Sequence, residues 1–224
     1  MLQTAVFKNP ERIQLSILSN LEKRTLIWLA QRMPRNVHSD HLTVLGFLGM
    51  LLAGVSYWVC RWNEQALFFV IFWLAVNWFG DSLDGTLARV RNQQRPRYGF
   101  YVDHVIDAFG ILFLMAGIAL SGYMSVWVAA GFLIAYYLLS IEIALATVSL
   151  GKFRLSFGLF GPTELRILLS FGNIFLFFRP YIQLFGVQYK LFDVGGIVGI
   201  GALLFIVLHS AVKNTIALYR EERI

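Results

Sequence analysis

The chain has 224 residues, of which 58% are hydrophobic and only 14% are charged. A soluble domain carries about 25% charged residues, so this composition excludes both an ordinary water-soluble globule and a disordered chain. The net charge of +6 comes from Lys and Arg residues that flank apolar runs, which is typical of membrane topology, and we expect no nucleic-acid partner. The single cysteine, Cys60, excludes an intrachain disulfide.

The N-terminal segment, residues 1–40, is polar and lacks the uninterrupted apolar stretch of a cleaved signal peptide. Within it, SNLE at 19–22 resembles a capping box, and apolar side chains recur on one helical face up to Pro34. We expect an amphipathic helix over 19–33 in the headgroup layer of a membrane, although a helix packed on a partner domain would show the same pattern. The lack of a targeting segment favours a bacterial inner membrane.

Six apolar runs follow, most of them near the length of about 20 residues that a membrane span needs. They occupy residues 42–60, 66–80, 100–121, 125–150, 165–186 and 194–212. The second run is short, but its helix can continue through Asp81 and Arg89. Basic residues follow spans two and four, which places both termini and the Arg-rich loop in the cytoplasm. The predicted fold class is an all-α integral membrane protein, with an interfacial helix in segment 1–40 and a six-helix transmembrane catalytic domain over 41–224.

Four carboxylates lie where the apolar spans meet the cytoplasm. Asp81 and Asp84 end span two, and Asp103 and Asp107 begin span three. Spacings of three and four residues place each pair on one helical face, and consecutive helices joined by a short loop bring the pairs together. Such carboxylates cost free energy unless they are paired, hydrated or bound to metal, and oxygen ligands favour Mg²⁺ or Mn²⁺. We therefore expect a divalent metal site; the alternative is pairing with the arginines of the following loop.

Small and basic residues surround these acids. Gly85 and Ala88 leave space beside Asp84, and Gly99 leaves space on the facing helix. Arg89 adds a fixed cation that is suited to phosphate. Metal, space and a guanidinium together indicate a site for a diphosphate with a nucleotide attached.

Two neighbouring stretches resemble the defining motif of the CDP-alcohol phosphotransferase family, DSLDGTLAR at 81–89 and GFYVDHVID at 99–107. All eight motif residues are present, and the nine-residue spacer 90–98 is one residue longer than in the family pattern. The run SDHLT at 39–43 is similar to the family's Pro-Asn-x-Leu-Thr at the start of span one, with Ser39 and Asp40 in place of Pro and Asn.

The resemblance implies a phospholipid-synthesising enzyme that transfers a substituted phosphate from a CDP-linked donor to an alcohol and releases CMP. It implies that two divalent ions, Mg²⁺ or Mn²⁺, bind to Asp81, Asp84, Asp103 and Asp107, with Asp107 also acting as general base. It implies that the cytidine and the diphosphate bind to Asp81, Gly85, Ala88, Arg89 and Gly99. A homodimer embedded in membrane lipid is implied as well.

The acceptor site is expected at the cytoplasmic mouth, where two basic residues follow span four and GPTELR at 161–166 begins span five. In related enzymes this region helps to bind the acceptor or its phosphate, which makes Glu164 and Arg166 candidates, with Lys152 and Arg154 completing a basic pocket. The alternative is a helix cap surrounded by the basic residues that set membrane orientation.

The direction of transfer is left open by the sequence. In one version, CDP-diacylglycerol gives its phosphatidyl group to a small alcohol; in the other, a CDP-linked alcohol gives its headgroup to a lipid such as diacylglycerol. A length of 224 residues favours the first. A membrane prenyltransferase is a rival enzyme class, against which six spans argue. A transporter with intramembrane carboxylates is a rival outside enzymes, but it would not need Gly85, Ala88 or Arg89.

Overall fold

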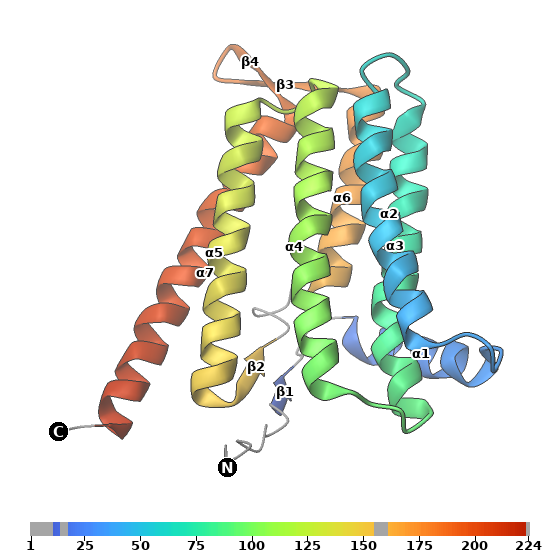
Figure 1. The fold of residues 1–224 in the computed structure, drawn as a ribbon. Helices are drawn as coiled ribbons and strands as arrows, with labels where there is room; N and C mark the ends of the chain where they lie inside the picture. The colour runs from blue at the N-terminus through green and yellow to red at the C-terminus, as the bar shows by residue number, and fades with distance from the viewer. Residues whose placement is uncertain (1–10, 14–17, 155–160, 223–224) are drawn as a thin grey trace.

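The computed structural model describes residues 11–13, 18–154 and 161–222. Its helices form one bundle, with a short two-stranded sheet at each end (Figure 1). The helices are α1 (Ser19–Arg32), α2 (Ser39–Val59), α3 (Ala66–Val90), α4 (Pro96–Ser121), α5 (Val126–Leu150), α6 (Pro162–Phe178) and α7 (Leu191–Glu221). The strands are β1 (Glu11–Ile13), β2 (Lys152–Arg154), β3 (Tyr181–Leu184) and β4 (Val187–Lys190). The predicted helical class is confirmed.

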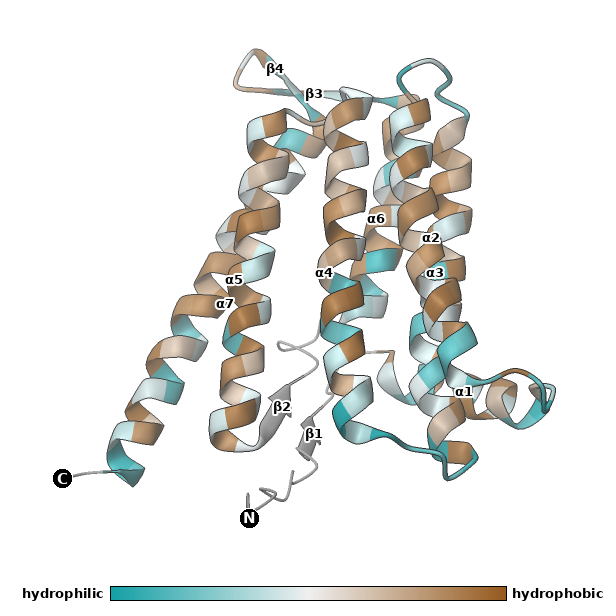
Figure 2. Cartoon of the chain, viewed as in Figure 1, coloured by the Kyte–Doolittle hydropathy of each residue, from teal (hydrophilic) through white to brown (hydrophobic). Residues whose placement is uncertain are grey.

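Five helices of the described chain are long and apolar enough to cross a membrane: α2, α3, α4, α5 and α7. Figure 2 shows hydrophobic residues along the middle of these helices and hydrophilic residues gathered near α1 and the loops. The five helices match five of the six predicted spans. Helix α3 continues through Asp81 and Arg89 to Val90, as the sequence predicted.

The predicted span 165–186 is wrong at its C-terminal end, because α6 stops at Phe178. Pro180 disfavours helical geometry for Arg179, whose backbone lies outside the helical region with φ −144° and ψ 84°. The chain then forms the antiparallel hairpin β3–β4, which turns at Gly186 with φ 81°. With 17 residues, α6 is about 26 Å long, less than the roughly 30 Å of a hydrocarbon core. A sixth complete span therefore stays a prediction.

Helix α1 lies across one end of the bundle, which we call the α1 end (Figure 1). It begins at Ser19 with no side-chain cap, so the predicted capping box is wrong. Its inner side packs Leu26 and Ala30 against α2 and α3, whereas Leu21 and Trp28 are 67% and 52% exposed. This exposed apolar side suits a membrane surface, and the interfacial location of α1 stays a prediction.

Helix α2 approaches both α3 and α4 closely through glycines. A Cβ at Gly80 of α3 would collide with the backbone of Gly46, and a Cβ at Gly117 of α4 would collide with the backbone of Gly54. We call these four residues the glycine seam. Small residues allow helix backbones to meet within a membrane, where apolar side chains gain little by leaving lipid. Because Gly80 directly precedes Asp81, the seam also fixes the position of the first carboxylate.

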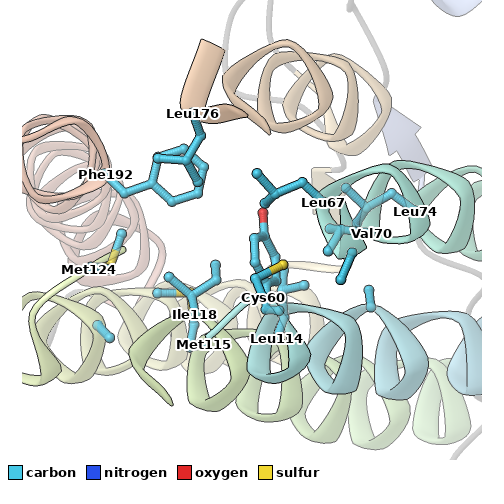
Figure 3. Close-up of a cluster of buried hydrophobic side chains, with 14 residues drawn as sticks. Cys60, Leu67, Val70, Leu74, Leu114, Met115, Ile118, Met124, Leu176 and Phe192 are labelled. Atoms are coloured by element: carbon cyan, nitrogen blue, oxygen red, sulfur yellow. The ribbon is translucent and has the colours of Figure 1, made fainter. Parts of the chain in front are cut away.

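The largest cluster of buried apolar side chains fills the half of the bundle away from α1. Figure 3 shows these side chains converging from several helices. Prominent members of the cluster are Tyr57, Leu67, Val70, Leu114, Ile118, Leu176 and Phe192. The α1 half, which carries the motif carboxylates, is thus left with a separate and smaller apolar cluster.

Helix α7 packs mainly on α5 and has only two buried residues among those described, Phe192 and Gly196. A polar contact within the membrane-spanning region joins the two helices. The Glu142 carboxylate of α5 accepts hydrogen bonds from Ser210 Oγ at 2.9 Å and from Asn214 Nδ2 at 2.6 Å. A carboxylate inside a span is thereby satisfied by partners on a neighbouring helix.

We expect Gly117→Ala to lower the melting temperature in detergent, because the added methyl group collides with the Gly54 backbone. Overpacking of this kind costs roughly 1–3 kcal/mol. Gly201→Ala in α7 is the matched control, since a Cβ there meets no atom within 4 Å. Equal melting temperatures for the two variants would contradict the close contact between α2 and α4.

Candidate active site

The four motif carboxylates converge at the α1 end of the bundle. Asp81 and Asp84 lie on α3, and Asp103 and Asp107 lie on α4. Asp107 interacts electrostatically with the other three carboxylates, and Asp84 interacts with Asp81 and Asp103. Asp84 is buried with 8% exposure, whereas Asp107 is exposed. The structure therefore brings the predicted acids together and leaves Asp107 accessible to a substrate.

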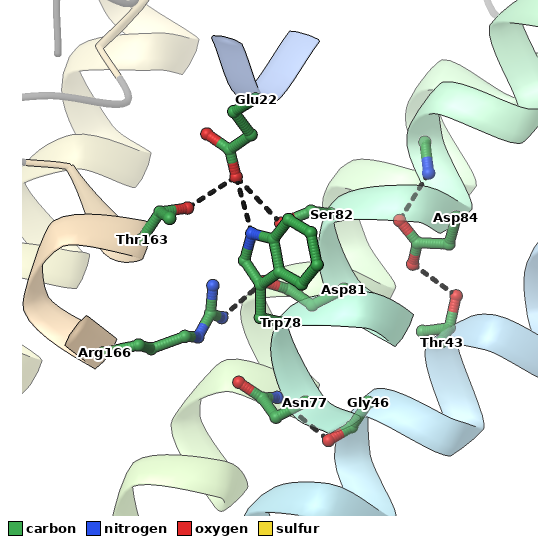
Figure 4. Close-up of polar contacts among 11 residues, drawn as sticks. Glu22, Thr43, Gly46, Asn77, Trp78, Asp81, Ser82, Asp84, Thr163 and Arg166 are labelled. Carbon is green, nitrogen blue, oxygen red and sulfur yellow. Dashed lines mark hydrogen bonds and ion pairs between the residues drawn. The ribbon is translucent and has the colours of Figure 1, made fainter. Parts of the chain in front are cut away.

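Helix α6 supplies a cation to this group. Arg166 Nη2 lies 2.5 Å from Asp81 Oδ2, and Figure 4 shows the guanidinium reaching from α6 to α3. Arg166 also interacts electrostatically with Asp107. Only 18% of the Arg166 side chain is exposed, so solvent screens this ion pair less than it would a surface pair. Arg166 is thus placed where it can stabilise negative charge at the carboxylates.

Two of the loop arginines have other partners. Arg91 donates to the backbone carbonyls of Met33, Pro34 and Val37, which tethers the α3–α4 loop to the segment between α1 and α2. Arg95 forms an ion pair with Asp40 at the start of α2. The alternative in which the loop arginines neutralise the motif acids is therefore not seen for these two.

The start of α2 holds Asp84 in place. Thr43 Oγ1 donates to Asp84 Oδ2 at 2.6 Å, and the Gly85 N–H donates to the other carboxylate oxygen (Figure 4). Ser39 Oγ donates to the Asp84 backbone carbonyl at 3.0 Å. The SDHLT run at 39–43 therefore belongs to the candidate site.

Open space lies beside the acids, as the small motif residues predicted. A Cβ at Gly85 would meet only Arg89 Nη1, at 3.5 Å, and a Cβ at Gly99 would meet nothing within 4 Å. Ala88 is partly buried on the same helix, and Arg89 is exposed with its Nη2 donating to Thr86 Oγ1 at 2.9 Å. The proposed nucleotide residues thus border a space next to a guanidinium.

The predicted acceptor residues have different surroundings in the structure. The Glu164 carboxylate accepts from the backbone N–H of the α6 N-cap residue at 2.9 Å and from Leu18 N–H at 3.0 Å, which is the capping role. Lys152 and Arg154 lie in β2, which pairs in parallel with β1, and their side chains lie outside the described part of the structure. Among the described candidates, Arg166 is the one that contacts the motif carboxylates.

Glu22 of α1 was not singled out as a site residue by sequence reasoning. Its Oε1 atom accepts from Thr163 Oγ1 at 2.5 Å, Trp78 Nε1 at 2.8 Å and Ser82 Oγ at 3.4 Å (Figure 4). In the sequence it resembles any acid on the polar face of an amphipathic helix. No local signal pointed to partners that lie 56 to 141 positions away.

Tyr136 of α5 is a second residue that the sequence did not indicate. It interacts electrostatically with Asp107, Arg166 and Asp81. The neighbouring Tyr137 hydroxyl donates to the Ala108 backbone carbonyl at 2.9 Å, which fixes this turn of α5 against the turn of α4 that carries Asp107. In an apolar run, a tyrosine resembles a lipid-facing aromatic, so its position beside the acids could not be predicted.

The donor chemistry of the four carboxylates fits hard divalent cations. Among the described residues, however, no three Asp, Glu, His or Cys side chains are grouped closely enough to hold an ion. Asp81 bonds Arg166 and Asp84 bonds Thr43, so these oxygens already have partners.

Comparison with known proteins assigns the chain to a class of membrane phosphotransferases. Residues 37–210 match the profile of the CDP-alcohol phosphatidyltransferases, and the chain belongs to this family. The archaetidylinositol phosphate synthase of Pyrococcus horikoshii is 32% identical over 136 residues, which are 61% of this chain and 69% of that protein. The predicted family is confirmed, and with it an enzyme of phospholipid synthesis; the prenyltransferase and transporter alternatives are excluded.

We expect Thr43→Val to destabilise the protein, because Asp84 Oδ2 loses its hydroxyl donor in buried surroundings. Loss of a hydrogen bond to a charged group costs about 1.5–3 kcal/mol. Thr43→Ser keeps the hydroxyl and should unfold close to the wild-type temperature. The measurement is thermal unfolding in detergent, and wild-type stability for the valine variant would show that this contact does not hold Asp84.

Proposed function

We propose that the protein transfers a phosphatidyl group from CDP-diacylglycerol to a small alcohol and releases CMP. A largely apolar groove that Arg166 lines is the observation that carries this proposal. A cavity of about 370 Å³ lies between α1, α3 and α6, and its lining includes Thr163 and Arg166 of α6 and Ile71 and Leu74 of α3. Apart from Glu22, Arg166 and three hydroxyl side chains, its lining is apolar, which suits acyl chains attached to a polar diphosphate. A lipid in this groove would have its headgroup beside Asp81.

The chemistry follows from the carboxylates and the guanidinium groups. Asp107 is exposed at the edge of the site, and we propose that it accepts the proton of the attacking hydroxyl as general base. Arg89 and Arg166 are fixed cations that can stabilise charge on the phosphates. We propose that the nucleotide lies against Asp81, Gly85, Ala88, Arg89 and Gly99, where the structure leaves space.

We further propose that Asp81, Asp84, Asp103 and Asp107 hold two divalent ions, either Mg²⁺ or Mn²⁺. When bound, such ions supply positive charge to the diphosphate and to the leaving CMP. The oxygen-only donor set and the mutual repulsion of four carboxylates support this proposal. Arg166, which pairs with Asp81, would lie beside these ions and could contact a substrate phosphate.

A phosphorylated polyol is our first candidate for the acceptor. The curated relative is named for making archaetidylinositol phosphate, so inositol phosphate leads the series to be tested. Arg166 is placed to contact an acceptor phosphate, and Lys152, Arg154 and Glu164 remain predicted contributors. In the second candidate function the lipid is the acceptor, and a CDP-linked alcohol donates its phospho-headgroup to diacylglycerol. The same groove would then hold the diacylglycerol.

The membrane setting of this reaction is also a proposal. Arg89, Arg91, Arg95 and Arg97 lie on or next to the loop at the α1 end, which supports a cytoplasmic site by the positive-inside rule. We propose a bacterial inner membrane, a homodimer, and a division of the chain into an interfacial segment 1–40 and a catalytic domain 41–224.

The decisive assay is CMP release by the purified protein in lipid with Mn²⁺ or Mg²⁺. CDP-diacylglycerol is offered with inositol phosphate, glycerol phosphate, serine or choline. Asp107→Asn should lower turnover by about 10²–10⁴-fold, the usual contribution of a general base, while CDP-diacylglycerol still binds. Asp193→Asn, at the opposite end of the bundle, makes the same chemical change as a control and should turn over normally.

If no acceptor supports CMP release, CDP-linked alcohols with diacylglycerol are tested next. Release there would establish the second candidate function. Silence in both arms, or normal turnover by Asp107→Asn, would contradict the proposed chemistry.

Removal of divalent ions should abolish CMP release, because the site then lacks the positive charge that the carboxylates and the diphosphate require. Addition of Mn²⁺ or Mg²⁺ to the EDTA-treated protein should restore turnover. Asp84→Asn should weaken Mn²⁺ binding, measured directly by electron paramagnetic resonance. Full activity in excess EDTA would refute a metal-dependent site.

A further inference from the structure

The Glu22 carboxylate of α1 joins two other helices at one atom. Its Oε1 accepts hydrogen bonds from Trp78 and Ser82 of α3 and from Thr163 of α6. Glu22 is partly buried and is the sole acidic residue of α1. An acid whose role was limited to solvating the polar face of α1 would not need three donors from two helices.

These partners lie next to the ion pair of the candidate site. Trp78 and Ser82 lie three residues before and one residue after Asp81, and Thr163 lies three residues before Arg166. Residues three apart on a helix share a face and are separated by about 5 Å along its axis. The Glu22 contacts and the Asp81–Arg166 ion pair therefore bridge the same two helices one turn apart (Figure 4).

A second contact attaches α1 to the first turn of α6. Glu164 accepts from the backbone N–H of Leu18, the residue directly before α1, while it caps α6. The first turn of α6 is thus tied to α1 at both Thr163 and Glu164. Since Arg166 follows in the next residues, its reach to Asp81 depends on where α1 places this turn.

We infer that Glu22 is a positioning residue, which clamps the first turn of α6 to α3 and so places Arg166 beside the motif carboxylates. The kinetic part of this inference rests on the proposed transfer reaction, whereas the clamp itself does not. Helix α1 is on this view a component of the active site in addition to any contact with the membrane surface. Glu22 also lines the cavity between α1, α3 and α6, but on this inference it acts through Arg166.

The kinetic test compares Glu22→Ala with Glu22→Gln. The alanine variant removes the acceptor and should lower kcat for CMP release by about 10- to 100-fold, as small misplacements of catalytic groups do, with KM for the donor and the acceptor nearly unchanged. The glutamine variant keeps a side-chain oxygen and should recover most of the activity. Glu221→Ala, an exposed acid at the end of α7, makes the same change in charge and residue type and should behave as wild type.

Hydrogen–deuterium exchange tests the clamp without any turnover. In Glu22→Ala, the amides of residues 165–169 in α6 should exchange faster than in the wild type, Glu22→Gln and Glu221→Ala. If the wild-type protein releases no CMP, the proposed function fails and the exchange result alone decides on the clamp. Unchanged exchange in Glu22→Ala would overturn the inference, and so would a rise in KM at constant kcat, which indicates direct substrate binding.

Discussion

Mutual repulsion among four carboxylates is the constraint around which the α1 end of this bundle is built. Like charges brought together near an apolar medium raise the free energy of the folded protein unless cations or hydrogen-bond donors compensate them. The compensation comes from separate helices: Arg166 of α6 pairs with Asp81, and Thr43 of α2 donates to Asp84. The contacts with these carboxylates thus stabilise the packing of α2 and α6 at the α1 end. Bound cations would reduce this repulsion further.

Different interactions hold the two halves of the bundle together. In the half away from α1, apolar side chains and the close Gly54–Gly117 contact hold α2 and α4 together. In the α1 half, polar contacts accompany a smaller apolar cluster, and the glycines at 85 and 99 leave room that side chains would otherwise fill. The Gly46–Gly80 contact connects the halves, because it fixes how closely α3 approaches α2 directly before Asp81. Rigid packing in one half therefore determines the geometry available in the other.

The sequence predicted the parts of the structure that depend on neighbouring residues along one helix. Hydrophobic periodicity and the Asp spacings placed the carboxylates and five spans, and the short second run was correctly extended through Arg89. It did not predict contacts between helices. Glu22 was assigned to a cap because its local pattern allowed one, but Trp78 and Thr163 lie far away in the chain and take up its carboxylate. The end of span five was missed for a different reason, since Pro180 interrupted an otherwise apolar run.

The loose attachment of α7 has a consequence for how the protein is made. Helix α7 packs mainly on α5, and the described contacts of the candidate site come from residues between Leu18 and Arg166. Chains fold as they are synthesised, with N-terminal units first. The helices that carry the site precede α7 in the chain, so the contacts among α1, α2, α3, α4 and α6 can form before α7 packs on α5. Docking of α7 through Glu142 would then follow assembly of the half that carries the site.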